Sequence, residues 1–177
     1  MDTGADLNQR AARVRVVLLD VDGVLTDGRI HAGAHGDDGR SFHARDGLGV
    51  RLGQRGGLTF GIISGRSSVA VADRASELDI HEIHQGIVDK IACVDGILER
   101  LEVLRDAVCF IGDDLVDIPV MRRVGLAAAP SDAALEAQEA AHLVTRSAGG
   151  KGAVREVVDL VLQASGKWQE VTKSFLE

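Results

Sequence analysis

Residues 16–28 have the sequence VVLLDVDGVLTDG, and the rest of the chain is best interpreted outward from them. Four branched apolar residues in succession are typical of a buried strand in a parallel sheet. The run stops at Asp20, and a second carboxylate follows at Asp22. At the carboxyl end of such a strand, two carboxylates can hold a divalent cation or attack an electrophile. Two acids in an ordinary turn would explain the pair equally well, so the other strand ends have to decide between the two interpretations.

The composition suits one globular domain, with 177 residues of which 45% are hydrophobic. The net charge of −7 disfavours nucleic acid and anionic membranes as partners, without excluding a small anionic substrate. Cys93 falls in a helical pattern and Cys109 in an apolar run, so both are expected to be free thiols in a reducing compartment. Because neither a signal peptide nor an apolar run near the ~20 residues of a membrane span is present, we expect a cytoplasmic protein.

Apolar runs and helical stripes alternate along the chain, which predicts an α/β fold with a doubly wound parallel sheet covered by helices on both faces. Between Ile30 and Phe42, a polar and glycine-rich segment predicts a hairpin that projects from this domain. We expect one domain at 14–165, after a mobile lead-in at 1–13 and before a tail at 166–177. The expected strands are 15–19, 58–63, 80–84, 107–111, 125–129 and 142–145; the expected helices are 46–55, Ser67 or Ser68 to 78, 89–104, 115–124, 132–141 and 151–163; the hairpin is 29–42.

Three of the predicted strands end in polar side chains, and the carboxyl ends of parallel strands meet at one edge of a sheet. Each of these residues has an ordinary explanation when taken alone, as a turn, a helix cap or a solvated side chain. It is less plausible that all the ordinary explanations hold together at three matching strand ends. The set comprises Asp20 and Asp22 after the first strand, Ser64 after the second, Asp113, Asp114 and Asp117 after a later one, and Lys90 at the start of a helix.

Phosphoryl transfer is the chemistry that needs such a set. A carboxylate that is charged at pH 7 can attack phosphorus to give an aspartyl-phosphate, and a divalent cation neutralises the repulsion between the two. Magnesium fits best because it prefers oxygen ligands and takes few carboxylates. A second acid protonates the leaving oxygen and later activates water, while a lysine and a serine bind the remaining phosphate oxygens. The segment 149–152, GGKG, could also cradle an anion, although a plain loop is at least as consistent with its spacing.

These residues resemble the haloacid dehalogenase superfamily of phosphatases. The likeness covers nearly the whole chain after about Arg13, and its four motifs occur in order: DVDGVLTDG at 20–28, Ser64, Lys90 and GDDLVD at 112–117. The chain has no room for a separate cap domain, which points to the capless subfamily. Within that subfamily the likeness is closest to the family of 3-deoxy-D-manno-octulosonate (KDO) 8-phosphate phosphatases, through FHARDGLGVR at 42–51, ISGR at 63–66 and GGKGAVRE at 149–156.

The resemblance implies a magnesium-dependent phosphatase of KDO and lipopolysaccharide biosynthesis, a homotetramer whose hairpins close neighbouring sites, and a tail at 166–177 that can reach a neighbour's site. Asp20 would be the nucleophile, Asp22 the general acid and base, and Asp114 and Asp117 would orient metal-bound waters or Lys90. The implied catalytic residues are Asp20, Asp22, Lys90 and Ser64; the metal ligands are Asp20, Asp22 through its carbonyl, and Asp113; the substrate contacts are Asp22, His43, Ala44, Arg45, Asp46, Gly47, Arg51, Arg66, Arg74 and Lys90.

Two alternatives remain. One is a phosphatase of the nine-carbon nonulosonate 9-phosphates, of the KDN and sialic acid type, against which the sequence RDG at 45–47 and Arg66 count. The other is a non-catalytic assembly subunit with the same fold, which the intact Asp20 and Asp22 disfavour.

Overall fold

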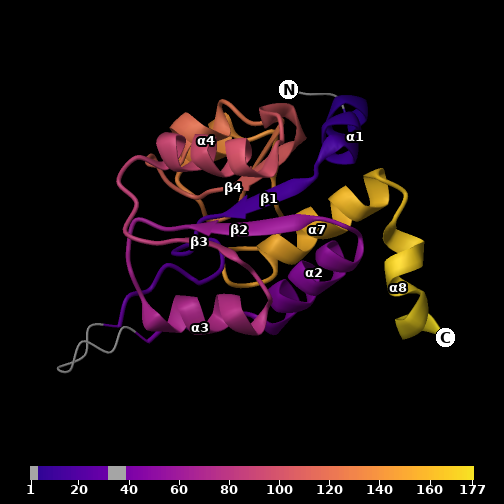
Figure 1. The fold of residues 1–177 in the computed structure, drawn as a ribbon, viewed down its shortest axis with the longest axis horizontal. Coiled ribbons are helices and arrows are strands. Elements are labelled where there is room, and N and C mark those ends of the chain that lie inside the picture. The colour runs from indigo at the N-terminus through magenta and orange to yellow at the C-terminus, as the bar shows by residue number, and fades with distance from the viewer. Residues whose placement is uncertain (1–3, 32–38) are drawn as a thin grey trace.

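A computed structural model describes residues 4–31 and 39–177. Its centre is a sheet of six parallel strands in the order β3-β2-β1-β4-β5-β6 (Figure 1). This order reverses direction between β1 and β4, which is the point where open α/β sheets bind their ligands. The strands are β1 (Val16–Leu19), β2 (Thr59–Ile63), β3 (Glu82–His84), β4 (Val108–Ile111), β5 (Leu126–Ala129) and β6 (Leu143–Val144).

Helices cover both faces of the sheet, and Figure 1 shows α4 on one side with α2 and α3 on the other. The strand β1 explains the layering, because Val17 and Leu19 belong to one apolar core and Val16 and Leu18 to the other. All four side chains are buried, as expected of a strand with packing on both faces. The helices are α1 (Gly4–Arg13), α2 (Ala44–Arg55), α3 (Val69–Glu77), α4 (Lys90–Leu101), η1 (Arg105–Ala107), α5 (Ile118–Met121), α6 (Leu135–Ala140), α7 (Ala153–Ala164) and α8 (Trp168–Leu176).

The predicted α/β class and parallel sheet are confirmed, and each expected strand and helix is present. Most have narrower bounds than expected, but α2 begins two residues earlier and α7 ends one residue later. The largest shortening is at 115–124, where only Ile118–Met121 is helical and Pro119 lies in the first turn, where it displaces no helical hydrogen bond. Within the described ranges, no second domain lies over the carboxyl edge of the sheet, in agreement with the predicted absence of a cap.

We expected a mobile lead-in at 1–13; residues 4–13 of this segment form helix α1. Ala11 is fully buried in the core that β1 and α7 share, and the Arg10 guanidinium donates to the carbonyl of Gly125 at 2.9 Å. The C-terminal segment is also helical, and Val171 of α8 joins the same core. The division into a domain at 14–165 and two flanking segments stays a prediction, now with both flanking helices packed against that domain.

The central half of the predicted hairpin at 29–42, residues 32–38, lies outside the described residues. The described residues on either side, 29–31 and 39–42, contain no strand. Among the described residues, no helix combines the length and the apolar character that crossing a membrane requires.

Candidate active site

Asp20 and Asp113 face each other because they follow two strands that are hydrogen-bonded neighbours. β1 and β4 pair in parallel with Leu19 beside Ile111, so both chains leave the sheet at the same level. The backbone N–H of Asp20 donates to the carbonyl of Ile111 at 3.0 Å, which extends the strand pairing to the acid itself. The position of Asp20 is therefore determined by the sheet.

Lys90 joins the two acidic strand ends. Its ammonium donates to Asp20 Oδ1 at 2.8 Å and to Asp117 Oδ1 at 2.6 Å, and its side chain is only 6% exposed. The second oxygen of Asp117 accepts the N–H groups of Asp113 and Asp114, at 3.0 Å and 3.4 Å. Both carboxylate oxygens of Asp117 therefore accept hydrogen bonds within the protein, and Asp117 connects Lys90 to the loop after β4.

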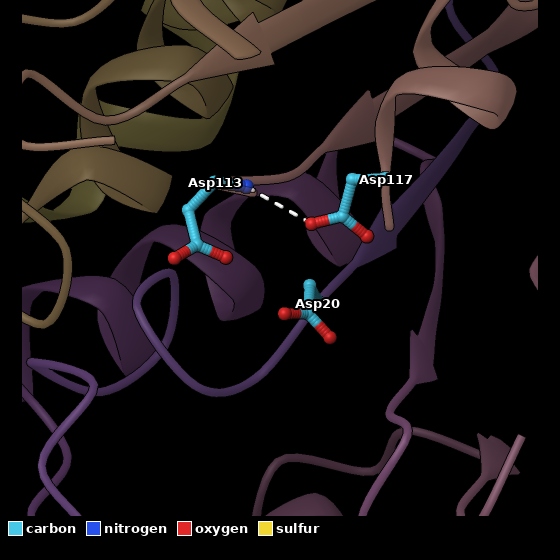
Figure 2. Close-up of side chains that lie close together, drawn as sticks. All are labelled: Asp20, Asp113 and Asp117. Atoms are coloured by element: carbon cyan, nitrogen blue, oxygen red, sulfur yellow. Dashed lines mark hydrogen bonds between the residues drawn. The ribbon is translucent and has the colours of Figure 1, made fainter. Parts of the chain in front are cut away.

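The carboxylates of Asp20, Asp113 and Asp117 form the cluster of metal-ligand type found among the described residues, with oxygens within 4.8 Å of one another (Figure 2). Burial, followed by the charge of Asp117, raises the pKa of Asp20 to about 6. Burial, followed by the charges of Asp20 and Asp117, raises the pKa of Asp113 to about 8. Burial lowers the pKa of Lys90, but the adjacent carboxylates of Asp20 and Asp117 raise it overall. One ammonium among three carboxylates leaves a deficit of positive charge, which a bound divalent cation would fill.

Asp22 is outside this cluster, and its carboxylate is bound by an arginine that the sequence patterns did not single out. Arg40 Nε donates to Asp22 Oδ1 at 2.8 Å, and an Arg40 NH2 nitrogen donates to Oδ2 at 3.1 Å. The Arg66 Nε atom lies farther away, 3.9 Å from Oδ2. An isolated arginine in a polar segment carries no periodicity or spacing that would indicate such a pair.

These side chains open into a cavity of about 430 Å³. Ser64, which is 3% exposed, follows β2 and its Oγ accepts the N–H of Arg66 at 3.2 Å. The cavity brings together seven of the predicted site residues, Asp114 among them, and has an apolar rim that includes Val88 and Val116. Its lining consists of Asp20, Asp22, Ser64, Gly65, Arg66, Ile87, Val88, Lys90, Asp113, Asp114 and Val116.

The other predicted substrate contacts belong to α2, α3 and the segment before α2, and none of these described residues lines the cavity. Arg51 pairs with Asp79 at 2.8 Å, and Arg74 pairs with Glu77 at 2.7 Å while it covers the ring of Phe42. Within one chain, the residues outside the cavity are His43, Ala44, Arg45, Asp46, Gly47, Arg51 and Arg74.

Asp46 has a structural role within the chain. It is 1% exposed, and its carboxylate accepts the N–H of Gly152 at 3.1 Å and the N–H of Arg155 at 2.9 Å, at the start of α7. Burial raises the pKa of Asp46, while these two N–H groups counteract that rise. Arg45 lies beside a second cavity, of about 460 Å³, together with Lys151 and Arg155.

The glycine pair at 149–150 supports the loop after β1. The N–H of Gly150 donates to the carbonyl of Val24 at 2.9 Å, and a Cβ on Gly149 would lie 1.8 Å from the carbonyl oxygen of Gly23. Only glycine permits this approach, so the segment is a packing partner of the loop that carries Asp22. Of the two interpretations of GGKG, the structure favours the plain loop.

Comparisons with known proteins extend over most of the chain. A family model described as haloacid dehalogenase-like hydrolase matches residues 74–157. The 3-deoxy-D-manno-octulosonate 8-phosphate phosphatase of Escherichia coli K12 is 43% identical over 166 residues, covering 94% of this chain and 88% of that protein.

Two crystal structures have the same overall fold. The 3-deoxy-D-manno-octulosonate 8-phosphate phosphatase of Yersinia pestis superposes with a TM-score of 0.91 at 43% identity, over 93% of this chain and 89% of that one. That of Moraxella catarrhalis, in complex with a magnesium ion, a phosphate ion and KDO, superposes with a TM-score of 0.95 at 33% identity, over 98% and 99%.

Proposed function

Because this chain belongs to the 3-deoxy-D-manno-octulosonate 8-phosphate phosphatases, a family of haloacid dehalogenase-like hydrolases, we propose that it hydrolyses KDO 8-phosphate to KDO and phosphate with magnesium. The observation that supports this most directly is the buried contact of Lys90 with Asp20 and Asp117, beside Asp113, at one wall of the cavity. This arrangement combines a nucleophile, a phosphate-binding cation and an acidic metal site within a few ångströms.

In the first step, Asp20 attacks phosphorus. The bond from phosphorus to Asp20 forms as the bond to the sugar oxygen breaks, and Asp22 gives its proton to that oxygen. Since its pKa is about 6, Asp20 is largely ionised at pH 7. Lys90 and Ser64 contact the remaining phosphate oxygens, and the pairing of Lys90 with Asp20 keeps the nucleophile in line.

In the second step, water replaces Asp20 on phosphorus. Asp22, now a carboxylate, accepts a proton from the attacking water, and the bond from Asp20 to phosphorus breaks to release phosphate. Both aspartates then return to their starting states. The same acid therefore serves both half-reactions, and its orientation matters twice.

Asp20 and Asp113, with the backbone carbonyl of Asp22, are the residues that would hold magnesium. When bound there, the ion would neutralise negative charge on the phosphate and on the nucleophile. Asp117 is not included among these ligands, because its two oxygens accept hydrogen bonds from Lys90 and from the backbone at 113–114. The raised pKa values of Asp20 and Asp113 support a cation at this position.

For the sugar acid, Arg66 is the guanidinium that the cavity itself offers. A planar guanidinium binds a carboxylate at two points, which suits an acidic sugar. We propose that the remaining predicted arginines on α2 and α3, Arg45, Arg51 and Arg74, reach the substrate in a neighbouring subunit's site, within a homotetramer. Val88 and Val116 support a covering subunit, because these rim residues are 100% and 66% exposed around a polar cavity.

We also propose a cytoplasmic location. The cysteines support it, since Cys93 and Cys109 are both free and Cys109 is buried. Unpaired thiols are typical of proteins in reducing compartments.

The proposed function is tested by measuring phosphate release from a series of sugar-acid phosphates, with magnesium or with a chelator. KDO 8-phosphate should be the best substrate, a nonulosonate 9-phosphate should be poorer, and chelation should abolish turnover. Asp20→Asn should lower kcat by at least about 10³-fold, because an amide cannot attack phosphorus. Activity that survives complete chelation, or an active Asp20→Asn variant, would contradict the proposal.

A further inference from the structure

The contact between Arg40 and Asp22 involves both oxygens of the carboxylate. Arg40 approaches them from two nitrogens, at 2.8 Å and 3.1 Å, and its side chain is only 1% exposed. Arg66, the other guanidinium near Asp22, lies at 3.9 Å and its side chain is 57% exposed. A two-point pair with a buried planar group fixes the plane of a carboxylate as well as its position.

The Asp22 side chain needs such a constraint. Asp22 lies three residues after the last residue of β1, and its side chain is half-buried in the cavity wall. It takes no part in the hydrogen bonds that connect Lys90 with Asp117. The oxygen of a general acid has to lie within about 2.6–3.2 Å of the atom that receives its proton, and in a defined direction from it. An oxygen that accepts from Arg40 still has a second lone pair for the proton, so the pairing is compatible with proton transfer.

We propose that Arg40 is the positioning residue of the general acid and base: it holds the Asp22 carboxylate in the orientation from which that group exchanges protons. This role rests on the proposed function, in which Asp22 serves both half-reactions. Arg40 acts through Asp22, so its loss should slow proton transfer and leave substrate binding nearly unchanged.

Two substrates separate this role from others, because their leaving groups differ. The sugar oxygen of KDO 8-phosphate needs a proton when it leaves, whereas p-nitrophenolate leaves without one. A misoriented Asp22 should therefore slow both half-reactions for the sugar phosphate. For p-nitrophenyl phosphate it should slow only the hydrolysis of the Asp20 phosphoenzyme, which would then accumulate.

The experiment compares Arg40→Gln and Arg40→Lys with wild type and with Arg29→Gln as the matched control. Arg29 belongs to the same predicted hairpin segment, 29–42. Its side chain is 80% exposed, and its NH1 atom lies 3.9 Å from a carboxylate oxygen of Asp27. Arg40→Gln should lower kcat for KDO 8-phosphate about tenfold or more, with KM within about twofold, as expected for lost orientation of a general acid. With p-nitrophenyl phosphate it should give a burst of p-nitrophenol and a phosphoenzyme that acid quenching traps. Arg40→Lys should recover part of kcat, and Arg29→Gln should match wild type.

Other results would overturn the role. A raised KM at unchanged kcat would make Arg40 a substrate contact, and equal losses on both substrates without phosphoenzyme would make it merely structural. If Arg40→Gln lowers the melting temperature, the role is judged from Arg40→Lys instead. A folded Arg40→Lys variant with full kcat would show that the two-point pairing with Asp22 is unnecessary. A wild-type protein without phosphatase activity would overturn the proposed function and this role together, whereas full activity in both Arg40 variants would overturn the role alone.

Discussion

Asp113 is the carboxylate whose ionisation the metal-free site disfavours most. Its pKa is about 8 because it is buried and lies near Asp20 and Asp117, with only the ammonium of Lys90 to compensate. In the unfolded chain the same group would titrate near its usual value of 3.8. Between these two values the folded state binds the extra proton, so the stability that Asp113 contributes declines as the pH rises through this window.

Asp113→Asn should remove this pH-dependent cost. With a chelator present, the melting temperature of the variant minus that of wild type should increase as the pH rises from about 4 to about 8. At the upper end of this range the variant should be the more stable protein. Magnesium should raise the melting temperature of wild type and have little effect on the variant, because the variant lacks a ligand. Thermal unfolding at several pH values, with chelator or magnesium, measures both effects. If the melting-temperature difference between variant and wild type did not change with pH, ionisation of Asp113 would not destabilise the metal-free protein.

The residue before helix α7 is a glycine, so the carboxylate that caps the helix N-terminus comes from another helix. Gly152 at the N-cap position has a φ of 109° and offers no side chain, while Asp46 from α2 accepts the N–H groups of Gly152 and Arg155. A carboxylate at this end also complements the positive end of the helix dipole. Asp46 therefore ties α2 to α7, two helices that cover the same face of the sheet.

Asp46→Ala should destabilise the protein by about 1 kcal/mol or more, as the loss of an N-terminal capping group does. Asp46→Asn should be intermediate, since its amide oxygen can still accept one N–H. Denaturant unfolding measures the change, and KM for the sugar-acid phosphate is measured in parallel. If KM rose while the unfolding free energy stayed at the wild-type value, Asp46 would be a substrate contact and its capping role would be minor.

The loop at 149–150 and the loop after β1 approach each other too closely for any side chain between them. Gly149→Ala would put a Cβ 1.8 Å from the carbonyl oxygen of Gly23, so the loop that carries Asp22 would have to move. We expect a lower melting temperature and a lower kcat, with a cost of about 1–3 kcal/mol as for other overpacked sites. Gly96→Ala is the matched control, because its Cβ would meet only the Arg100 side chain, at 3.8 Å. A Gly149→Ala variant as active and stable as this control would contradict the packing argument.

The cavity of one chain is open to solvent on the side of its apolar rim, and the guanidinium groups of Arg51 and Arg74 are paired on other surfaces of the same chain. This supports the proposal that a second copy brings such residues over the cavity to complete the sugar-acid site. Desolvation by that copy would also strengthen the electrostatic contacts of Asp20, Lys90 and Asp113.

Hybrid oligomers test this arrangement. Arg74→Ala and Asp20→Asn should each be nearly inactive on KDO 8-phosphate, for loss of a contact and of the nucleophile. When co-expressed with different tags and purified by both, they should recover activity, because an intact Asp20 then faces an intact Arg74 from its neighbour. Light scattering should give the mass of a tetramer. Hybrids no more active than the separate variants would place Arg74 and Asp20 in the same chain's site, and a fully active monomer would refute the shared site.

The sheet and its acidic edge were predictable from local patterns. A strand that is buried on both faces must be apolar at every position, which is why residues 16–19 and 108–111 were recognisable as strands. Parallel strands all end at the same edge, so Asp20, Ser64 and Asp113 could be placed together before any contact was known. For these features, the order of residue types along the chain contains sufficient information.

The pairing of distant side chains came only from the packed fold. Helix α1 is mostly polar, and its burial of Ala11 depends on a neighbour more than a hundred residues away in α7. Arg40 meets Asp22, and Asp46 meets Gly152, although neither partner stands at a spacing that local structure would bring together. The physical reason is that local sequence sets backbone preference and the period of burial, whereas the partner of a single charged side chain depends on distances that exist only once the helices and the sheet have packed.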